Sequence, residues 1–285
     1  MTVSFVIPTW NRKALLEGAL AAIALLRRPA GCIVEAVVVD NGSTDGSAES
    51  AAALGARVVR LERNEGVSRA FNRGIAAARG EYVALLNNDV EPAEDWLEIL
   101  LAALEADGGW FAAGKSLDWA DRGRIDGAGD AVCRGGAAWR LGHGRPDGPA
   151  FDGRRRTYFP SATATLFRRE FFERLGGFEE AFFAYLEDVE LGFRAAEAGL
   201  DGGYIPEARV YHRGSATEGA WSARTVRWLT AHQILLLAKH YPAGMLLGFA
   251  RPIAAAQTLW ALLAVSRGRG GAWAAGLADG LRGWR

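Results

Sequence analysis

Residues 33–45 read IVEAVVVDNGSTD, a mostly apolar run that ends in the acid Asp40 and is followed by turn residues. A run of this kind is typical of a strand buried in a parallel sheet, because helices cover both faces of such a sheet. Ser43 or Thr44 can cap a helix that we expect near residues 45–54. The stretch therefore predicts one strand–helix unit of an α/β protein.

The same alternation continues on either side of this unit. We expect strands at residues 3–7, 33–39, 58–61, 82–86 and 110–113, and helices at 12–27, 45–54, 67–79 and 93–106. The pattern predicts an α/β fold with a mostly parallel sheet covered by helices on both faces. Sheets of this kind bind ligands at the carboxyl ends of their strands.

The second half of the chain is less regular. Residues 114–157 are rich in Gly, Asp and Arg and lack periodicity, which predicts a long surface excursion that is functional or mobile. Further elements are expected as strands at 164–167 and 209–212 and helices at 169–175 and 188–198. From residue 223 we expect a helical extension of three stretches, broken at Pro242 and at 268–271.

Composition excludes several classes of protein. The 285 residues carry 33 basic and 33 acidic side chains, so no overall charge favours nucleic acid as a partner. Half of the residues are apolar, which excludes a disordered chain. Cys32 and Cys133 lack metal-site spacing and indicate a reducing compartment. The N-terminus runs directly into a strand, so we expect no secretory signal and a cytoplasmic location.

The extension differs in charge from the rest of the chain. Residues 1–222 hold 32 acids and 25 bases, whereas residues 223–285 hold eight bases and one acid, Asp279. The bases accompany four tryptophans: Trp228, Trp260, Trp273 and Trp284. Arg251 interrupts the most apolar part and argues against a membrane span. We expect this extension to dock at the interface of an anionic membrane, on its cytoplasmic side, with packing on the first domain or homodimerisation as the alternatives.

Asp40 is the first candidate for chemistry. A turn with a helix cap explains Ser43 but not an acid at the end of a buried strand, where a carboxylate can accept hydrogen bonds from a ribose or base. Dinucleotide-binding folds use such an acid, but they need a glycine-rich turn after the first strand. Residues 8–12 read PTWNR, without a glycine, so a hydride-transfer enzyme would lack its phosphate site, and no P-loop follows this strand either.

Two further strand ends carry polar side chains. Asn87-Asn88-Asp89 follows the strand at 82–86, and His212 is the last residue of the strand at 209–212. Asp89 is either a helix cap or a ligand of a hard cation that holds a diphosphate. His212 is either structural or, together with Asp89, a metal ligand.

A third acidic group opens a helix at Glu187, Asp188 and Glu190. Acids in a first turn interact favourably with the helix dipole. The neighbouring aromatic residues would also desolvate a carboxylate and raise its pKa, which suits a general base. The residues alone leave both interpretations open.

Taken together, these segments resemble the inverting family 2 nucleotide-sugar glycosyltransferases, which have the Rossmann-like GT-A fold. The similarity is greatest to the bacterial rhamnosyltransferase-like members that build cell-surface polysaccharides. The matching segments lie in order at residues 6–12, 37–45, 64–66, 72–75, 80–89, 176–178, 187–191 and 211–212.

The resemblance implies roles for individual residues. It implies a catalytic domain over residues 1–222, with nucleotide binding in about 1–113 and acceptor binding and catalysis in about 114–222. The nucleotide-sugar site would contain Pro8, Thr9, Asn11, Asp40, Asn64, Gly66, Asn72 and Asn88. Asp89 and His212 would bind Mg²⁺ or Mn²⁺, and Asp188, beside Glu187, would be the base. Asn87 stands where the family often has the first acid of Asp-x-Asp, which implies weaker metal binding.

The implied activity is metal-dependent, inverting transfer of a sugar from a nucleoside-diphosphate sugar, with UDP or dTDP, to a glycan or lipid-linked acceptor. A sugar nucleotidyltransferase is an alternative, but it needs a glycine-rich loop after the first strand. A degenerate glycan-binding module is supported only by Asn87. A paired-acid glycoside hydrolase is disfavoured, because the adjacent Glu187 and Asp188 cannot readily flank one bond.

Overall fold

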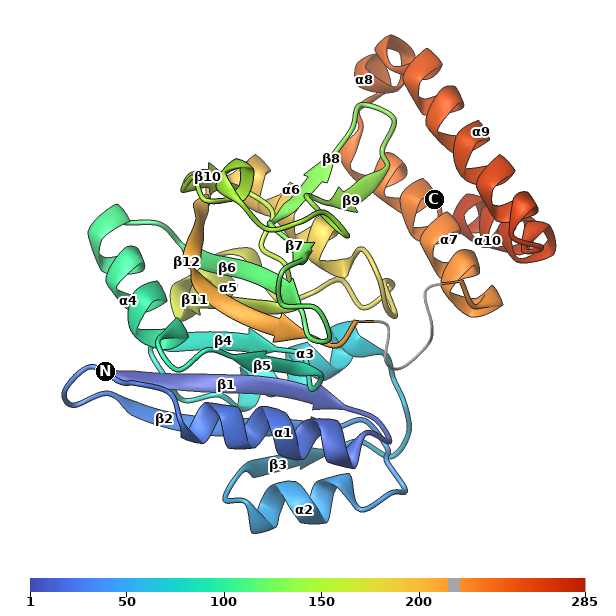
Figure 1. The fold of residues 1–285 in the computed structure, drawn as a ribbon. Helices are drawn as coiled ribbons and strands as arrows, with labels where there is room; N and C mark the ends of the chain where they lie inside the picture. The colour runs from blue at the N-terminus through green and yellow to red at the C-terminus, as the bar shows by residue number, and fades with distance from the viewer. Residues whose placement is uncertain (215–220, 285) are drawn as a thin grey trace.

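A computed structural model of the chain describes residues 1–214 and 221–284 as an α/β domain followed by a helical extension (Figure 1). Arg285, one of the basic residues noted above, lies outside the described residues. The strands are β1 (Thr2–Thr9), β2 (Ile33–Asp40), β3 (Arg57–Arg60), β4 (Tyr82–Leu86), β5 (Val90–Pro92), β6 (Phe111–Asp118), β7 (Ile125–Gly127), β8 (Asp130–Val132), β9 (Ala138–Arg140), β10 (Arg155–Thr157), β11 (Ala164–Arg168) and β12 (Gly202–His212).

The helices of the α/β domain are α1 (Lys13–Ala24), α2 (Ser47–Ala53), α3 (Val67–Ala77), α4 (Trp96–Asp107), α5 (Arg169–Leu175) and α6 (Glu187–Ala198). The extension holds α7 (Ala223–His240), α8 (Ala243–Gly248), α9 (Ala250–Ser266) and α10 (Gly270–Arg282). Its described part therefore has four helices instead of the expected three stretches, because the chain turns at Phe249 between α8 and α9.

One large sheet organises the α/β domain, with the strand order β10-β12-β6-β11-β4-β1-β2-β3. Strands β1 to β4 pair in parallel, and β12 is parallel to β6. Strand β11 is antiparallel to both of its neighbours, β4 and β6. The predicted α/β fold with a mostly parallel sheet is confirmed.

Helices bury both faces of this sheet. On one face, Leu16 of α1 and Trp96 of α4 pack with Phe5 of β1. On the other face, Phe71 of α3 and Leu191 of α6 belong to a second cluster. Alternate residues of the strands face opposite sides, so both faces of a strand must be apolar, and this is why the runs read from the sequence are nearly continuous.

The expected excursion at residues 114–157 contains more structure than its sequence indicated. It begins inside β6, and β7 and β10 extend the large sheet, while β8 and β9 form a separate hairpin. The side chain of Lys115 is fully buried and lies 2.7 Å from Asp147 and 2.5 Å from Asp152, so two ion pairs tether the segment to β6. Strands of three residues are too short to show periodicity, which is why they were not predicted.

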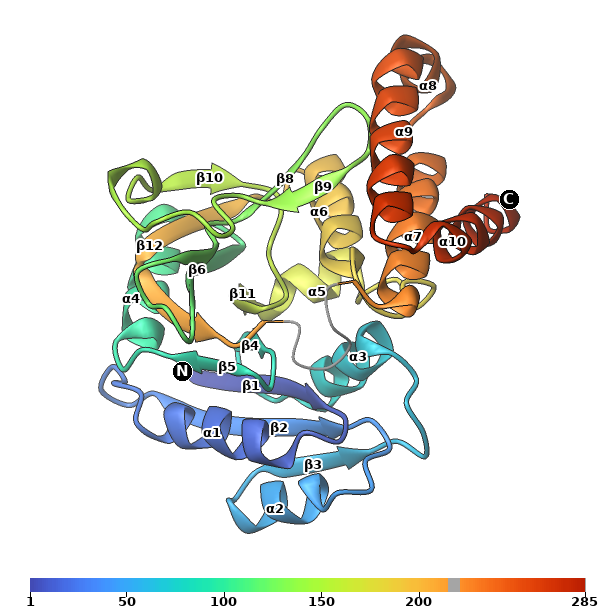
Figure 2. The same cartoon turned by 45° about the vertical axis from the view of Figure 1, so that its right-hand side comes forward.

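The helical extension packs on the α/β domain through α7 (Figure 2). Leu236 of α7 is fully buried in a cluster with Phe182 and Val189. The tip of the β8–β9 hairpin lies against the same helices, because Tyr241 donates a hydrogen bond to the Cys133 carbonyl, at 3.3 Å. Among the described helices, none is long and apolar enough to cross a membrane.

Candidate active site

A cavity of about 580 Å³ opens where β1 and β4 end, at the position that the sequence predicted for a ligand. Its walls come from the strand ends, the β8–β9 hairpin, the start of α6 and the helix α7. Eight of the predicted site residues line it: Pro8, Thr9, Asn64, Asn88, Asp89, Glu187, Asp188 and His212. The structure therefore brings residues that are far apart in sequence into one cavity.

The ends of β1 and β4 are joined by a side-chain hydrogen bond. Asn88 Nδ2 donates to Thr9 Oγ1 at 2.9 Å, and both side chains are buried. This bond fixes the polar floor of the cavity next to Asp89.

Asp89 and His212 lie in contact, as the metal-site hypothesis requires. Strand β12 pairs with β5 so that His212 lies opposite Val90, and His212 Nε2 is 3.3 Å from Asp89 Oδ1. His212 Nδ1 lies 2.8 Å from an oxygen of Asp126. Burial alone would lower the pKa of His212, but hydrogen bonds and charges from Asp126 and Asp89 outweigh it and raise the pKa to about 9.

These residues fit a divalent cation that is shared with a ligand. A carboxylate and an imidazole nitrogen are suitable donors, and Asn87 and Asn88 line the same part of the cavity. Among residues 1–214 and 221–284, no three His, Cys, Asp or Glu side chains form a metal-binding group. A cation here would therefore need further ligands from a bound diphosphate, as is usual for Mg²⁺.

Asp126 and Arg140 form a charged network behind His212 that the sequence did not predict. Arg140 donates to Asp126 and to Thr163, each at 2.8 Å, and Ser116 donates to Asp126 at 2.9 Å. Burial would raise the pKa of Asp126, but the bond with His212 and the Arg140 charge lower it below its ordinary value. Both residues lie on short strands of the irregular segment 114–157, where no sequence signal distinguished them from other Asp and Arg residues.

Three carboxyl groups lie near this network in the cavity: Glu187 and Asp188 at the start of α6, and Asp130, which pairs with Arg140 across the β8–β9 hairpin. Asp188 Oδ2 accepts a hydrogen bond from the backbone of Ala162 at 3.1 Å. Burial raises the pKa values of Asp188, Glu187 and Asp130, and the charge of Asp188 raises the pKa of the other two further. Glu187 Oε2 is buried without a hydrogen-bond partner among the described residues. Carboxyl groups with raised pKa values in a cavity are candidates for proton transfer.

The backbone is strained at the two residues that directly precede these acids. Tyr185 and Leu186 have φ values of 70° and 66°, which side chains other than glycine rarely adopt. Such strain is typical of functional sites. Glu190, by contrast, does not line the cavity: it forms a two-point ion pair with Arg194, with contacts of 2.8 to 3.1 Å, and its role is structural.

Four residues of the predicted nucleotide site do not line the cavity. Asp40 is buried and accepts a hydrogen bond from the backbone of Ser43 at 3.1 Å, and Asn11 accepts one from Thr44 at 2.8 Å. Gly66 has φ +92° and leaves room for Phe183, whose carbonyl oxygen would lie 2.6 Å from an added Cβ. The Asn72 side chain forms two hydrogen bonds with the backbone of Phe178, at 2.9 and 2.7 Å. Their binding roles stay predictions.

Five aromatic side chains also line this cavity. They are Trp10, Trp139, Phe183, Tyr185 and Trp228. Trp139 belongs to β9 and Trp228 to α7, where it stacks on Phe183 with ring centres 5.0 Å apart. The extension therefore contributes a wall of the cavity, which its sequence did not indicate.

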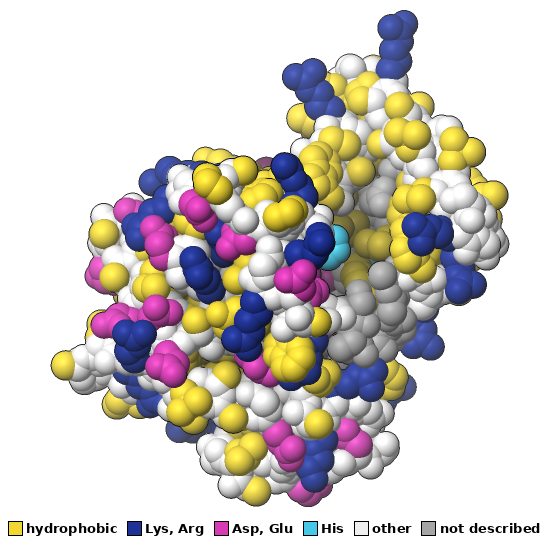
Figure 3. Space-filling view, viewed as in Figure 1, with side chains coloured by type: hydrophobic (Ala, Val, Ile, Leu, Met, Phe, Trp, Pro, Cys, Tyr) yellow, Lys and Arg dark blue, Asp and Glu magenta, His cyan; other side chains and the backbone are white. Residues whose placement is uncertain are grey.

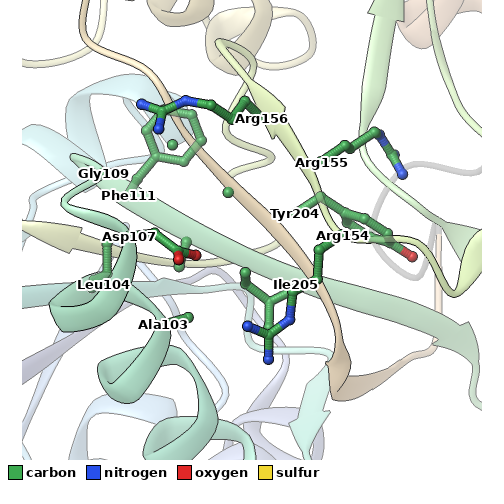
Figure 4. A pocket seen from close by; sticks show the side chains of 13 residues that line it. Ala103, Leu104, Asp107, Gly109, Phe111, Arg154, Arg155, Arg156, Tyr204 and Ile205 are labelled. Carbon is green, nitrogen blue, oxygen red and sulfur yellow. The ribbon is translucent and has the colours of Figure 1, made fainter.

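A second cavity, of about 310 Å³, lies near the start of β12 (Figure 4). Arg154, Arg155 and Arg156 line it, but each already has a partner. Arg154 pairs with Glu207 at 3.1 Å, Arg156 pairs with Asp201, and Arg155 lies over the ring of Tyr204. This cavity shares no lining residue with the larger one.

Known structures share this fold. The chain superimposes on a mannosyltransferase from Pyrobaculum calidifontis, in complex with GDP-Man and Mn²⁺, with a TM-score of 0.60 and 21% identity, covering 98% of this chain and 86% of that one. It also superimposes on residues 1–349 of S. aureus TarS, in complex with UDP, with a TM-score of 0.56 and 17% identity, covering 84% and 70% of the two chains. At these identities the likeness shows the fold alone.

Proteins found by sequence similarity share a higher sequence identity with this chain than these structures do. An N-acetylglucosaminyl-diphospho-decaprenol L-rhamnosyltransferase of Mycobacterium tuberculosis is 30% identical, over 74% of this chain and 76% of its own length. An uncharacterised protein of Sinorhizobium fredii is 32% identical over 76% of this chain, which spans only 25% of that relative.

Family assignment rests on two matches along the chain. Residues 143–277 match the family described as "Glycosyl transferase family group 2". Residues 4–176 match "Glycosyl transferase family 2", and the prediction of a glycosyltransferase is thus confirmed at the level of the family. The chain belongs to glycosyl transferase family 2.

Proposed function

We propose that this protein transfers a sugar from a nucleoside-diphosphate sugar to a hydroxyl group of a glycan or lipid-linked acceptor, with inversion at the anomeric carbon. One observation carries the proposal: Asp89 and His212 are in contact in the same cavity that holds the carboxyl groups of Glu187 and Asp188. The first pair suits a cation-bound diphosphate, and the second suits removal of a proton. The mycobacterial relative is named for a lipid-linked acceptor, which supports this class of acceptor.

The reaction would use the residues as follows. The acceptor hydroxyl gives its proton to Asp188 while its oxygen bonds to the anomeric carbon, and the bond from that carbon to the diphosphate oxygen breaks. The nucleoside diphosphate leaves with the electron pair of the broken bond. Asp89 and His212 would hold Mg²⁺ or Mn²⁺, which, when bound, neutralises charge that develops on the leaving diphosphate. Arg140 places a further positive charge in the same cavity.

A donor screen tests this proposal. Calorimetry with UDP-, dTDP- and GDP-sugars, each with Mn²⁺, Mg²⁺ or EDTA, should identify one nucleotide that binds clearly better with the metal. A neutral sugar without a nucleotide should not bind comparably. Failure of every nucleotide sugar to bind in the presence of metal would contradict the proposed donor class.

Asp126 is expected to position His212 for the metal. Its contact with Nδ1 leaves Nε2 directed toward Asp89. Loss of such an outer partner typically weakens metal binding about 10–100-fold, so Asp126→Asn should reduce the gain in nucleotide affinity that Mn²⁺ provides by that factor. Calorimetry with and without Mn²⁺ measures this gain.

Ser116→Ala is the matched control, since Ser116 bonds to the same carboxylate without contacting His212. It should change the metal-dependent gain much less. An unchanged gain in Asp126→Asn would show that Asp126 does not position the ligand.

A further inference from the structure

The helices α8 and α9 present an apolar face that no described part of the chain covers. The exposed fractions are 80% for Leu247, 67% for Leu259, 61% for Leu262 and 59% for Val265. Figure 3 shows hydrophobic side chains over this outer part of the molecule, with basic side chains at its tip. An exposed apolar group of this kind, on helices that project beyond the α/β domain, marks an interaction surface.

The opposite side of α9 faces α7, and a few contacts orient the helix. Trp260 Nε1 donates to Thr230 Oγ1 of α7 at 2.8 Å, and Ala264 is fully buried. The helix α10 packs closely on α7, where an added Cβ on Gly280 would lie 2.7 Å from Ile234. The outer leucines of α9 therefore lie on the side of the helix that faces away from α7.

Most of the tail tryptophans are not part of this face. Trp228 stacks on Phe183, and Trp260 stacks on Trp221 with ring centres 5.9 Å apart. Trp273 is half-buried, and only Trp284 is exposed. The aromatic rings hold the extension together, and aliphatic side chains form its outer surface.

The basic residues at both ends of α9 indicate which kind of surface binds this apolar face. Arg251 lies at the start of α9, and Arg267 and Arg269 follow its end, with no charged residue between Arg251 and Arg267. In the described parts of the chain, no carboxylate forms an ion pair with any of these three arginines. The one acid of the extension, Asp279, is paired with Arg227 and Arg282. An apolar face with basic ends is complementary to an anionic lipid surface.

We propose that this face, made of Leu247, Leu259, Leu262 and Val265 and flanked by Arg251, Arg267 and Arg269, docks on an anionic phospholipid bilayer. The helix α9 lies in the plane of the interface, with its leucines among the acyl chains and its arginines at the headgroups. Because α7 of the same helical unit lines the large cavity, docking brings that cavity close to the lipid surface. This inference goes beyond the proposed sugar transfer and does not depend on it.

Vesicle flotation of the full chain tests the proposal. The protein should float with vesicles of phosphatidylglycerol and phosphatidylcholine at low salt, float far less at high salt, and float poorly with phosphatidylcholine alone. The double variant Leu259→Ser/Leu262→Ser should lower the partition coefficient at least tenfold, since it removes two large apolar side chains from the docking face.

The matched control is Leu25→Ser/Leu54→Ser, which changes two leucines that are 68% and 57% exposed near the ends of α1 and α2. Native flotation of this control is expected. Nucleotide binding without vesicles should be the same in all variants, which separates this test from that of the proposed function.

Two outcomes would overturn the docking proposal. One is that the native protein ignores anionic vesicles at low salt, or that the Leu259/Leu262 variant floats as well as the control. The other is that the native protein is a dimer that this variant converts to a monomer, with no flotation in either form. The face would then be an interface between two copies of the chain.

Discussion

Asp188→Asn is expected to lower kcat by about 10²–10⁴-fold while donor affinity stays near that of the native protein. The amide has nearly the size of the carboxylate but cannot accept the proton of the acceptor hydroxyl. The native carboxylate accepts hydrogen bonds from the backbone of Ala162 and Val189, at 3.1 and 2.9 Å, and an amide keeps one of them. Steady-state kinetics, together with calorimetry of donor binding, measures both quantities.

Glu187→Gln is the matched control, because it makes the same chemical change at the adjacent position. If it reduces kcat more than Asp188→Asn does, the roles of the two acids are reversed. The pH profile gives a second check. Burial raises the pKa of Asp188, whose neighbours include Glu187, Asp130 and Arg140, and only the ionised form accepts a proton. The native kcat/KM should therefore rise with pH through this raised pKa, and the Asp188→Asn variant should lack that rise.

Asp89→Asn should lower activity by about 10³-fold or more and remove the gain in nucleotide affinity that Mn²⁺ provides. An amide carries no charge to hold the cation beside the diphosphate, and Asn87 and Asn88 already leave Asp89 as the one acid of this turn. His212→Ala should weaken the metal effect less, because an imidazole contributes no negative charge toward the cation, whereas Asp89 does. Titration of the donor nucleotide with Mn²⁺ and with EDTA measures the effect.

Asp121→Asn is a suitable control for the loss of one negative charge. Asp121 is exposed and pairs with Arg124 outside the cavity, so this variant should keep both activity and the metal effect. Equal nucleotide affinity of the native protein in EDTA and in Mn²⁺ would contradict the metal assignment itself.

Local sequence patterns were sufficient to predict the layers of the fold. Strands such as β1 and β4 are buried on both faces, so their apolar runs are visible without knowledge of the rest of the chain. The polar turn after β4 was recognised because it directly follows a predicted strand. The acids of α6 were recognised because they open a predicted helix. The same reasoning predicted a ligand at the edge of the sheet where the large cavity opens.

The remainder of the site depends on contacts between distant segments. Arg140 and Asp126 reach His212 only because the segment that carries them is held by β6 and by the helical extension. Three-residue strands, and ion pairs such as those of Lys115, produce no periodic pattern of apolar residues in a sequence. For the same reason, nothing in the sequence indicated that Trp228 would line the cavity.

The β8–β9 hairpin has a consequence for how this protein could be recombined with its relatives. Its tip fits against the extension, where added Cβ atoms on Gly135 and Gly136 would lie 2.6 Å from Pro252 and from Leu237, and its base carries Arg140. The close fit depends on residues of both the hairpin and the extension. The extension is therefore not an interchangeable module: a chimera that imports helices from a relative must import the matching hairpin with them, and the two segments are expected to have diverged together.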